Sequence, residues 1–427
     1  MHRGEEDEEE YPLDENQAFA DSSDAPCAEV MAGGQWVRNA QGEKVRLKKS
    51  SSNLERILRH DPCWADRLEF DEFRQTATLD RRPMTDEMER RAMVRISTKY
   101  EVEFSDQEVG KLMQAQARER PYDPIQDYLL GLEWDGVSRV DHWLEDCFDI
   151  ENTELTRAYS RKFLISAVAR VLSPGCKVDT VLVLVGGQGA GKTSTFATLF
   201  GSKWHSEMSV DIRSKDAVIG LSGSWCVEWS ELDTLKRSQN TAMKSFISRD
   251  KDVLRPPYGR NSITIKRRVV FAGTTNDLGF LTDPTGSRRF WCVEVPDGFK
   301  ADLAGLKANR DQLWAEAVHL YLPGIPGESS KDCTWWLTDE EEAMRIEASQ
   351  KFESVDPWLD AVRDWIETHP SQDGYTATEI LTRALDKNVS VVRRGDEQRL
   401  AAVLQALGYE KRQVRVDGAR RYRWVSR

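Results

Sequence analysis

The run VLVLVGGQGAGKT at residues 181–193 constrains the fold more than any other part of this chain. Val181 to Val185 are β-branched or leucine, as in a parallel strand that is buried on both faces. The loop that follows has the spacing Gly-x-x-x-x-Gly-Lys-Thr, and residues 194–200 can continue as a helix. A strand, a glycine-rich loop and a helix in this order direct backbone N–H groups and a helix N-terminus toward a phosphate. The run therefore predicts a P-loop in an α/β fold.

In a P-loop the lysine reaches the β- and γ-phosphates of a nucleoside triphosphate, and the next hydroxyl binds Mg²⁺. These two residues are Lys192 and Thr193 in this chain. We therefore expect the chain to bind ATP and Mg²⁺. The expected nucleotide contacts come from Gly186, Gly187, Gln188, Gly189, Ala190, Gly191, Lys192 and Thr193.

Hydrolysis also needs one acid that holds Mg²⁺ and one that polarises the attacking water. The strand-like run at 225–229 carries Glu228, and Glu231 follows near its carboxyl end, the edge at which ligands bind in open α/β sheets. We assign Glu228 to Mg²⁺ and Glu231 to the water, although the two roles can be exchanged and Asp233 is a third candidate. Any one of these acids can instead cap the helix expected near Leu232.

A polar amide and two arginines complete the candidate catalytic set. Asn276 ends the strand-like run 269–275, where an amide can contact the γ-phosphate and orient water, the role called sensor 1 in ATPases of the AAA+ type. The alternative for Asn276 is a turn residue. Arg288 or Arg289 can serve as an arginine finger, often donated by a neighbouring subunit, or can be a surface pair that binds acids or phosphate.

Residues 255–268 contain five basic side chains and no acid. Two short β-type runs around the Gly259-Arg260-Asn261 turn predict a hairpin. Such a hairpin can grip a nucleic-acid backbone inside the pore of a ring, or it can simply be solvated. The candidate DNA contacts are Arg255, Arg260, Lys266, Arg267 and Arg268.

The pattern along the chain predicts five segments. Residues 1–34 form an acidic disordered tail, 35–120 a small helical domain, 121–325 the P-loop domain, 326–355 a linker, and 356–427 a basic C-terminal domain. In the last segment we expect helices at 357–368, 376–387 and 396–407, then a hairpin that turns at Asp417-Gly418. Three helices followed by a hairpin outline a winged helix. The predicted fold is thus α/β, with an AAA+-like parallel-sheet core, a helical N-terminal domain and a winged-helix-like C-terminal domain.

Charge and cysteine content exclude several classes of protein. Residues 1–30 carry eleven acids and one arginine, which accounts for most of the net charge of −12. This tail can mask a basic surface as a DNA mimic, or it can only confer solubility. The seven cysteines form no C-x-x-C pair, which argues against a disulfide framework or a zinc site, and no apolar run is long enough to span a membrane. We expect a location in the cytoplasm of a bacterial host.

Taken together, these motifs resemble the virulence-associated protein E family of phage and mobile-element ATPases, a branch similar to superfamily 3 helicases. The resemblance covers about residues 50–325. It rests on Glu133-Trp134-Asp135-Gly136 with Arg139, residues 174–177, 186–193, Glu228 with 231–233, residues 255–260, 273–276 and 283–291, and 312–317. It implies a hexameric or other ring-forming homo-oligomer that acts in DNA replication, often beside a primase. This sequence shows no primase module, so we expect any priming to need a separate polypeptide or an unrecognised activity.

The leading hypothesis is an ATP-dependent DNA helicase or translocase of a phage or mobile element that moves single-stranded DNA through its pore. The alternative is a nucleotide-controlled initiator or switch whose C-terminal domain binds duplex DNA without unwinding it. A small-molecule kinase is disfavoured by the paired acids, the asparagine and the additional DNA-binding modules.

Overall fold

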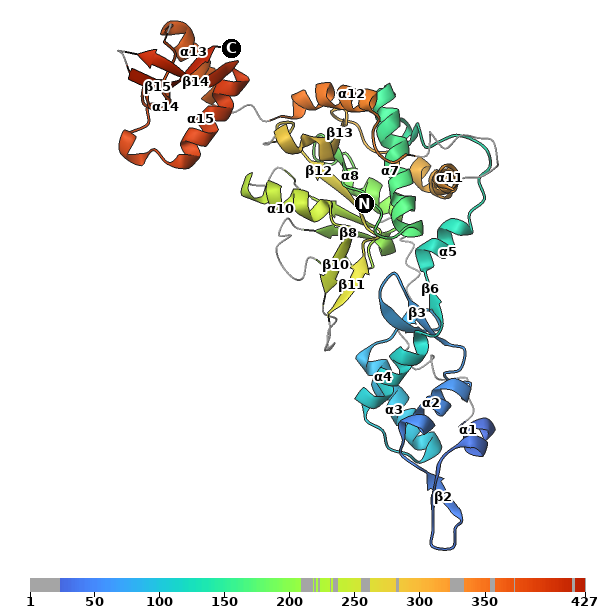
Figure 1. Cartoon of the computed structure of the whole chain (residues 1–427). Helices are drawn as coiled ribbons and strands as arrows, with labels where there is room; N and C mark the ends of the chain where they lie inside the picture. The colour runs from blue at the N-terminus through green and yellow to red at the C-terminus, as the bar shows by residue number, and fades with distance from the viewer. Residues whose placement is uncertain are drawn as a thin grey trace. The chain divides into compact units, whose positions relative to one another are not determined.

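The computed structural model describes residues 24–208, 218, 220, 221, 223–230, 232, 237–254, 262–281, 284–322, 334–353, 358–371, 373–416 and 419–426 (Figure 1). The chain divides into two compact units. One comprises Met1–Asp277 with Thr285–Ala348, and the other comprises Leu278–Pro284 with Ser349–Arg427.

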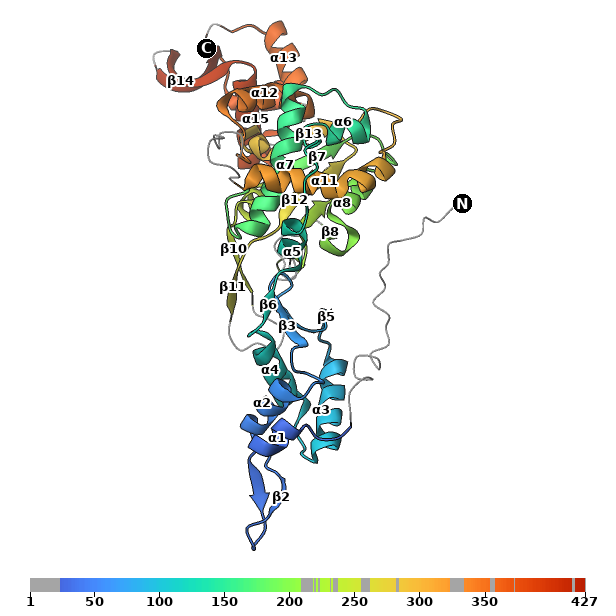
Figure 2. The same ribbon diagram turned by 90° about the vertical axis from the view of Figure 1, so that its right-hand side faces the viewer.

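A five-stranded parallel sheet forms the core of the first unit (Figure 2). Its strands are β7 (Val181–Val185), β8 (His205–Met208), β9 (Cys226–Trp229), β12 (Val270–Thr275) and β13 (Phe290–Glu294). They lie in the order β13-β7-β12-β9-β8, and every neighbouring pair is parallel. All residues of β7 are buried, which explains its unbroken apolar sequence because both of its faces are covered. The predicted parallel α/β sheet is confirmed.

Large aromatic side chains fix the helices around this sheet. Phe200 lies 5.0 Å from Trp225 and 5.1 Å from Trp314, measured between ring centroids. The indole N–H of Trp225 donates to the carbonyl of Ala167, and that of Trp314 donates to the carbonyl of Leu199. These contacts hold the helix after the P-loop in place. The helical elements of this region are α5 (Pro124–Leu130), α6 (Trp143–Phe148), α7 (Glu154–Leu172), α8 (Lys192–Phe200), η2 (Ser202–Trp204), α10 (Arg237–Ile247), η4 (Pro284–Arg289), α11 (Leu303–Tyr321) and α12 (Asp339–Ser349). The next helical element, η6 (Gln350–Phe352), belongs to the second unit.

The N-terminal part of the first unit contains the predicted helices and also strands that the sequence analysis missed. The helices are α1 (Ala28–Gly33), α2 (Ser51–His60), α3 (Asp86–Tyr100) and α4 (Asp106–Ala117). The strands are β1 (Trp36–Arg38), β2 (Lys44–Leu47), β3 (Leu68–Asp71), β4 (Thr76–Leu79), β5 (Arg82–Pro83) and β6 (Pro121–Tyr122). β1 and β2 form a hairpin, and the others form a sheet in the order β5-β4-β3-β6. Strands of two to four residues are too short to show a clear alternating pattern.

The predicted basic hairpin is present as two antiparallel strands. These are β10 (Lys251–Leu254) and β11 (Ile263–Lys266), paired from Lys251 opposite Lys266 to Leu254 opposite Ile263. Residues 255–261, which connect the strands, lie outside the described residues.

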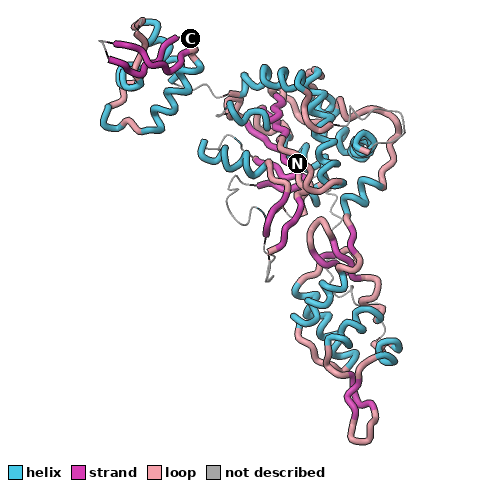
Figure 3. Tube along the Cα trace, in the orientation of Figure 1, coloured by secondary structure: helices cyan, strands magenta, loops and turns pink. Residues whose placement is uncertain are grey.

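The second unit contains helices followed by a hairpin (Figure 3). Its helical elements are α13 (Trp358–Thr368), α14 (Ala377–Glu379), the π-helix η7 (Ile380–Ala384), η8 (Val389–Val391) and α15 (Arg394–Ala406). β14 (Tyr409–Val416) and β15 (Ala419–Ser426) pair antiparallel along their whole length. Trp424 of β15 is buried in a core that includes Leu400 and Leu404 of α15. In neither unit do the described residues form a helix that is both long and apolar enough to cross a membrane.

Candidate nucleotide-binding site

The P-loop joins the end of β7 to the start of α8, and two glycines make its conformation possible. Gly191 precedes α8 with a φ of +85°, a value that favours glycine because other residues are strained there. A Cβ atom at Gly186 would lie 2.8 Å from the carbonyl oxygen of Val295, so a larger residue does not fit. The backbone N–H of Gly186 also donates to the carbonyl of Thr275, which attaches the loop to the end of β12.

Lys192 is the first residue of α8 and is 7% exposed. Its ammonium nitrogen donates to the carbonyl oxygens of Gly186 at 2.7 Å and Gly187 at 2.8 Å, and to Oδ1 of Asn276 at 2.9 Å. Burial lowers the pKa of Lys192, while the carboxylate of Glu228 acts in the opposite direction. The ammonium group is therefore held inside the loop by neutral oxygen atoms.

Glu228 lies on β9 and is fully buried. Its Oε1 atom accepts hydrogen bonds from the hydroxyls of Thr193 and Thr274, each at 2.8 Å. Its Oε2 atom lies 3.1 Å from Nε2 of His205 on β8. The sheet thus holds Glu228 beside Thr193, the pair that the sequence analysis assigned to Mg²⁺. The residues of this cluster come from three adjacent strands (β8, β9 and β12) and from α8.

Asn276 directly follows β12, the strand between β7 and β9. This position explains its contact with Lys192, because the carboxyl ends of parallel neighbours meet at one edge of the sheet. Glu231 and Asp233 lie outside the described residues, so the choice between the acids for the water-activating role stays a prediction.

The two arginines at the end of η4 lie differently. Arg288 is exposed, and Arg289 is half-buried. Nε and Nη2 of Arg289 each lie 3.3 Å from the hydroxyl oxygen of Ser248, which follows α10. Among the described residues, no hydrogen bond or ion pair joins either arginine to Lys192 or Glu228.

The basic residues assigned to DNA fall into three groups. Arg255 and Arg260 lie outside the described residues, and Lys266 is exposed on β11. Arg267 is 3% exposed, and its guanidinium forms a bidentate pair with Asp252 at 2.7 and 2.8 Å. It also lies 4.7 Å from the ring centre of Phe246. We therefore correct the assignment of Arg267, because its side chain is used inside the fold.

Arg268 is also committed to contacts within the chain. It pairs with Asp123, which precedes α5, and lies 3.9 Å from Glu72. Its guanidinium is half-buried between these acids and is not a free DNA contact. Lys266 remains the described member of the set that faces solvent.

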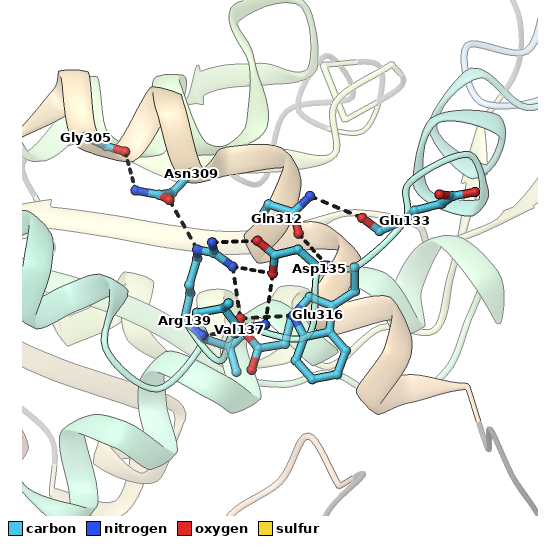
Figure 4. Close-up of polar contacts among 10 residues, drawn as sticks. Glu133, Asp135, Val137, Arg139, Gly305, Asn309, Gln312 and Glu316 are labelled. Atoms are coloured by element: carbon cyan, nitrogen blue, oxygen red, sulfur yellow. Dashed lines mark hydrogen bonds and ion pairs between the residues drawn. The ribbon is translucent and has the colours of Figure 1, made fainter.

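A second cluster, shown in Figure 4, joins two motifs that the sequence analysis noted without assigning a role. Arg139 forms a bidentate ion pair with Asp135, at 2.8 Å for each bond, and its Nε donates to Asn309 of α11. Glu316 of α11 accepts from the hydroxyl of Ser138 and from the backbone N–H groups of Arg139 and Val140. The Arg139 guanidinium lowers the pKa of Asp135 to about 2, with help from the N–H of Val137. The segment before α6 is thereby fixed to α11.

The described part of the chain contains no group of three or more His, Cys, Asp or Glu side chains that could hold a metal ion by themselves. Unlike structural zinc, Mg²⁺ does not need such a group of side chains, because it is commonly bound by one or two protein oxygens together with phosphate and water. The Thr193 and Glu228 oxygens fit such a site.

Comparison with known proteins identifies the family. The profile of the virulence-associated protein E-like domain matches residues 129–354, more than half of the chain. The chain belongs to the virulence-associated protein E-like family. The match contains the P-loop, Glu228, Asn276 and the segment with Arg139, so the resemblance expected from the sequence is confirmed.

A search of curated proteins gave no match for this virulence-associated protein E-like chain. Among solved structures, it is similar to apo forms of the NrS-1 C-terminal region. One has 14% identity and a TM-score of 0.45, and the similarity covers 84% of this chain and 95% of that chain. A second has 13% identity, a TM-score of 0.44 and the same coverage. A third has 15% identity and a TM-score of 0.40, and covers 70% of this chain and 78% of that chain.

Proposed function

We propose that this protein is an ATP-dependent DNA helicase or translocase of a phage or mobile element, which acts in DNA replication as a ring-forming P-loop ATPase. The observation that carries the proposal is the convergence of Lys192, Thr193, Glu228 and Asn276 at the carboxyl edge of β7, β12 and β9. Membership of the virulence-associated protein E-like family supports the same activity.

A triphosphate in the P-loop changes the partners of Lys192. The ammonium group, now bound to two carbonyls and Asn276, turns toward the β- and γ-phosphates, where a full negative charge offers a stronger hydrogen bond. The lowered pKa of Lys192 returns toward its ordinary value when these anions arrive. Asn276 is then free to orient the attacking water.

Thr193 and Glu228 suit Mg²⁺ for a specific reason. The Thr193 hydroxyl donates its proton to Glu228, which leaves the oxygen lone pairs available to a cation. The fully buried carboxylate supplies a compensating charge, and Thr274 and His205 hold it in place. A Mg²⁺ ion held by Thr193 and Glu228 would supply positive charge to offset that of the phosphates. Glu231 then polarises the water, unless it exchanges this role with Glu228.

The arginine finger and the ring form one part of the proposal. Arg288 is exposed and Arg289 contacts only a serine hydroxyl among its described hydrogen-bond partners, so neither is neutralised by an acid there. A guanidinium of this kind can stabilise charge on the γ-phosphate bound by a neighbouring subunit. This arrangement requires a homo-oligomer, and we propose a hexamer.

Single-stranded DNA is the proposed substrate of the pore. The hairpin of β10 and β11 carries Lys266 on its surface, and the connecting residues include Arg255 and Arg260. Paired strands form a firm support for such a loop, because Arg267 anchors β11 through Asp252 of β10. A partner primase and a location in the cytoplasm of a bacterial host complete the proposal.

The second unit favours one alternative, a nucleotide-controlled initiator or switch that binds duplex DNA. Its helices followed by a hairpin have the outline of a winged helix, and the last nineteen residues contain seven Lys or Arg and two acids. Strand displacement on a forked duplex separates the two functions. Displacement driven by ATP supports the helicase, whereas ATP-dependent duplex binding without displacement supports the initiator.

A further inference from the structure

The hairpin of β1 and β2 is a basic ribbon in an acidic chain. Residues 35–49, which we call the basic ribbon, contain five cations and one acid, Glu43, whereas the whole chain has a net charge of −12. The cations are Arg38, Lys44, Arg46, Lys48 and Lys49. In both Figure 1 and Figure 2 this hairpin projects beyond α1 and α2. Leu47 at its base is buried in the core of the N-terminal region, which fixes the ribbon to that core.

Most of these charges are not neutralised within the fold. Lys49 pairs with Glu108, and Arg38 donates to the carbonyl of Gly42. Lys44 lies 5.0 Å above the ring of Trp36. Arg46 and Lys48 are exposed, and within the described part of the chain neither forms an ion pair. The ribbon therefore presents a net positive charge to solvent.

The register places cations on both faces of the ribbon. Arg46 is opposite Val37, and Lys44 is opposite Arg38. The register shifts between Val37 and Arg38 and leaves Val45 of β2 without a partner, so the alternation of β2 is broken at this point. Along β1 successive residues alternate, so Arg46, opposite Val37, lies on the other face from Arg38 and Lys44. Val45 is 59% exposed and Val37 is 36% exposed, so apolar contact surface lies among the charges. A ribbon of this kind matches a polyanion that also offers apolar groups to contact.

We propose that the basic ribbon binds duplex DNA by entering the major groove. The major groove is about 12 Å wide and admits a two-stranded ribbon, with a phosphate backbone on each wall. The cations would then meet backbone phosphates, and the exposed valines would lie near base edges, including thymine methyl groups. This inference is independent of the nucleotide site and shares with the proposed function only the expectation that the ligand is DNA.

Fluorescence anisotropy with the full-length protein, without nucleotide, tests the inference. The variant Arg46→Ala/Lys48→Ala is compared with Arg90→Ala/Lys111→Ala, which removes the same charge from exposed positions on α3 and α4. Each lost phosphate contact lowers the slope of log affinity against log salt by about 0.9 on duplex DNA. We expect the ribbon variant to bind a short duplex about tenfold less tightly at low salt and to lose about 1.8 from this slope. The control pair should retain the wild-type slope.

If the ribbon variant keeps the duplex affinity and the salt slope of the wild type, the proposal is overturned. If its mass in solution also differs from that of the wild type, the ribbon instead forms a contact between copies of the chain. An equal loss on single-stranded DNA would overturn the groove assignment. Val37→Ser/Val45→Ser gives a second test that leaves every charge in place, and it should weaken duplex binding without changing the slope. ATP hydrolysis by all these variants without DNA should equal that of the wild type, so a failed nucleotide site is detected separately.

Discussion

The ammonium nitrogen of Lys192 lies 2.9 Å from Oδ1 of Asn276, although the two residues are 84 positions apart in the sequence. The contact exists because β12 is inserted between β7 and β9, which brings the residue after β12 to the P-loop. The same insertion places Thr274 beside Glu228. One strand order thus connects the phosphate-binding lysine, the buried acid and the amide.

Replacement of Lys192 by alanine should abolish ATP hydrolysis and leave the fold intact. The side chain supplies the only cation among the described residues that contacts the P-loop carbonyls, and loss of one such electrostatic contact typically costs 10²–10³-fold in rate. Hydrolysis is measured by phosphate release and the fold by circular dichroism. Lys300→Ala, an exposed lysine, is the matched control. Normal turnover in the Lys192 variant would contradict the site assignment.

Asn276→Ala should slow hydrolysis by about 100-fold while ATP binding changes little, because the amide orients water rather than holding the phosphates. Single-turnover hydrolysis and nucleotide titration separate these effects. Asn276→Asp is informative as well, since a carboxylate at this position would pair with Lys192 and compete with phosphate. A loss of ATP affinity equal to the loss of rate in the alanine variant would show that Asn276 is a binding residue instead.

Arg289→Ala should impair hydrolysis on the order of 10³-fold and still permit ATP binding. If Arg289 acts on a neighbouring subunit, mixing this variant with Lys192→Ala restores part of the activity, because mixed interfaces contain one intact site. Ser248→Ala removes the hydroxyl that contacts Arg289 and should cost far less. The same hydrolysis and mixing measurements on Arg288→Ala show which of the two arginines acts as the finger. If the mixture recovers no hydrolysis, an arginine finger donated by a neighbouring subunit is excluded.

Arg267→Ala should destabilise the first unit by about 3–5 kcal/mol, since it leaves the carboxylate of Asp252 buried without its partner. Lys266→Ala, one residue earlier and exposed, should leave the melting temperature unchanged and weaken binding of single-stranded DNA. Thermal unfolding and DNA titration of both variants provide the comparison. Equal stability of the two would argue against the structural role of Arg267.

The Asp135–Arg139 pair should make stability depend on pH in the acid range. The folded pKa of Asp135, about 2, lies below its ordinary value, so the stabilisation is present above about pH 4 and is lost as the pH falls through about 2. Asp135→Asn should therefore melt at a lower temperature than the wild type at about pH 5, and the difference should shrink toward about pH 2. A difference that stays constant over this range would contradict the assignment.

Several features could be predicted from the sequence because their patterns are local. The P-loop needs only Gly186 to Thr193 and the apolar strand before it, and both occur in sequence order. The β10–β11 hairpin was likewise indicated by two short runs around a turn.

Other features depend on contacts between distant residues. Nothing near Arg267 in the sequence shows that its guanidinium will pair with Asp252. Because Arg267 lies in a basic run, the sequence suggested a DNA contact instead. His205 was missed because only the β8–β9 pairing places it beside Glu228. The bond between Arg139 and Asn309 spans 170 residues, and the short N-terminal strands lack a recognisable period.

ATP hydrolysis by the purified full-length protein, measured with and without single-stranded DNA and alongside Lys192→Ala, tests the central claim most directly. We predict hydrolysis that is absent in the variant and strongly stimulated by DNA in the wild type, together with an ATP-dependent increase in mass. Hydrolysis that persists in Lys192→Ala, or that is indifferent to DNA and comes from a monomer, would contradict the account.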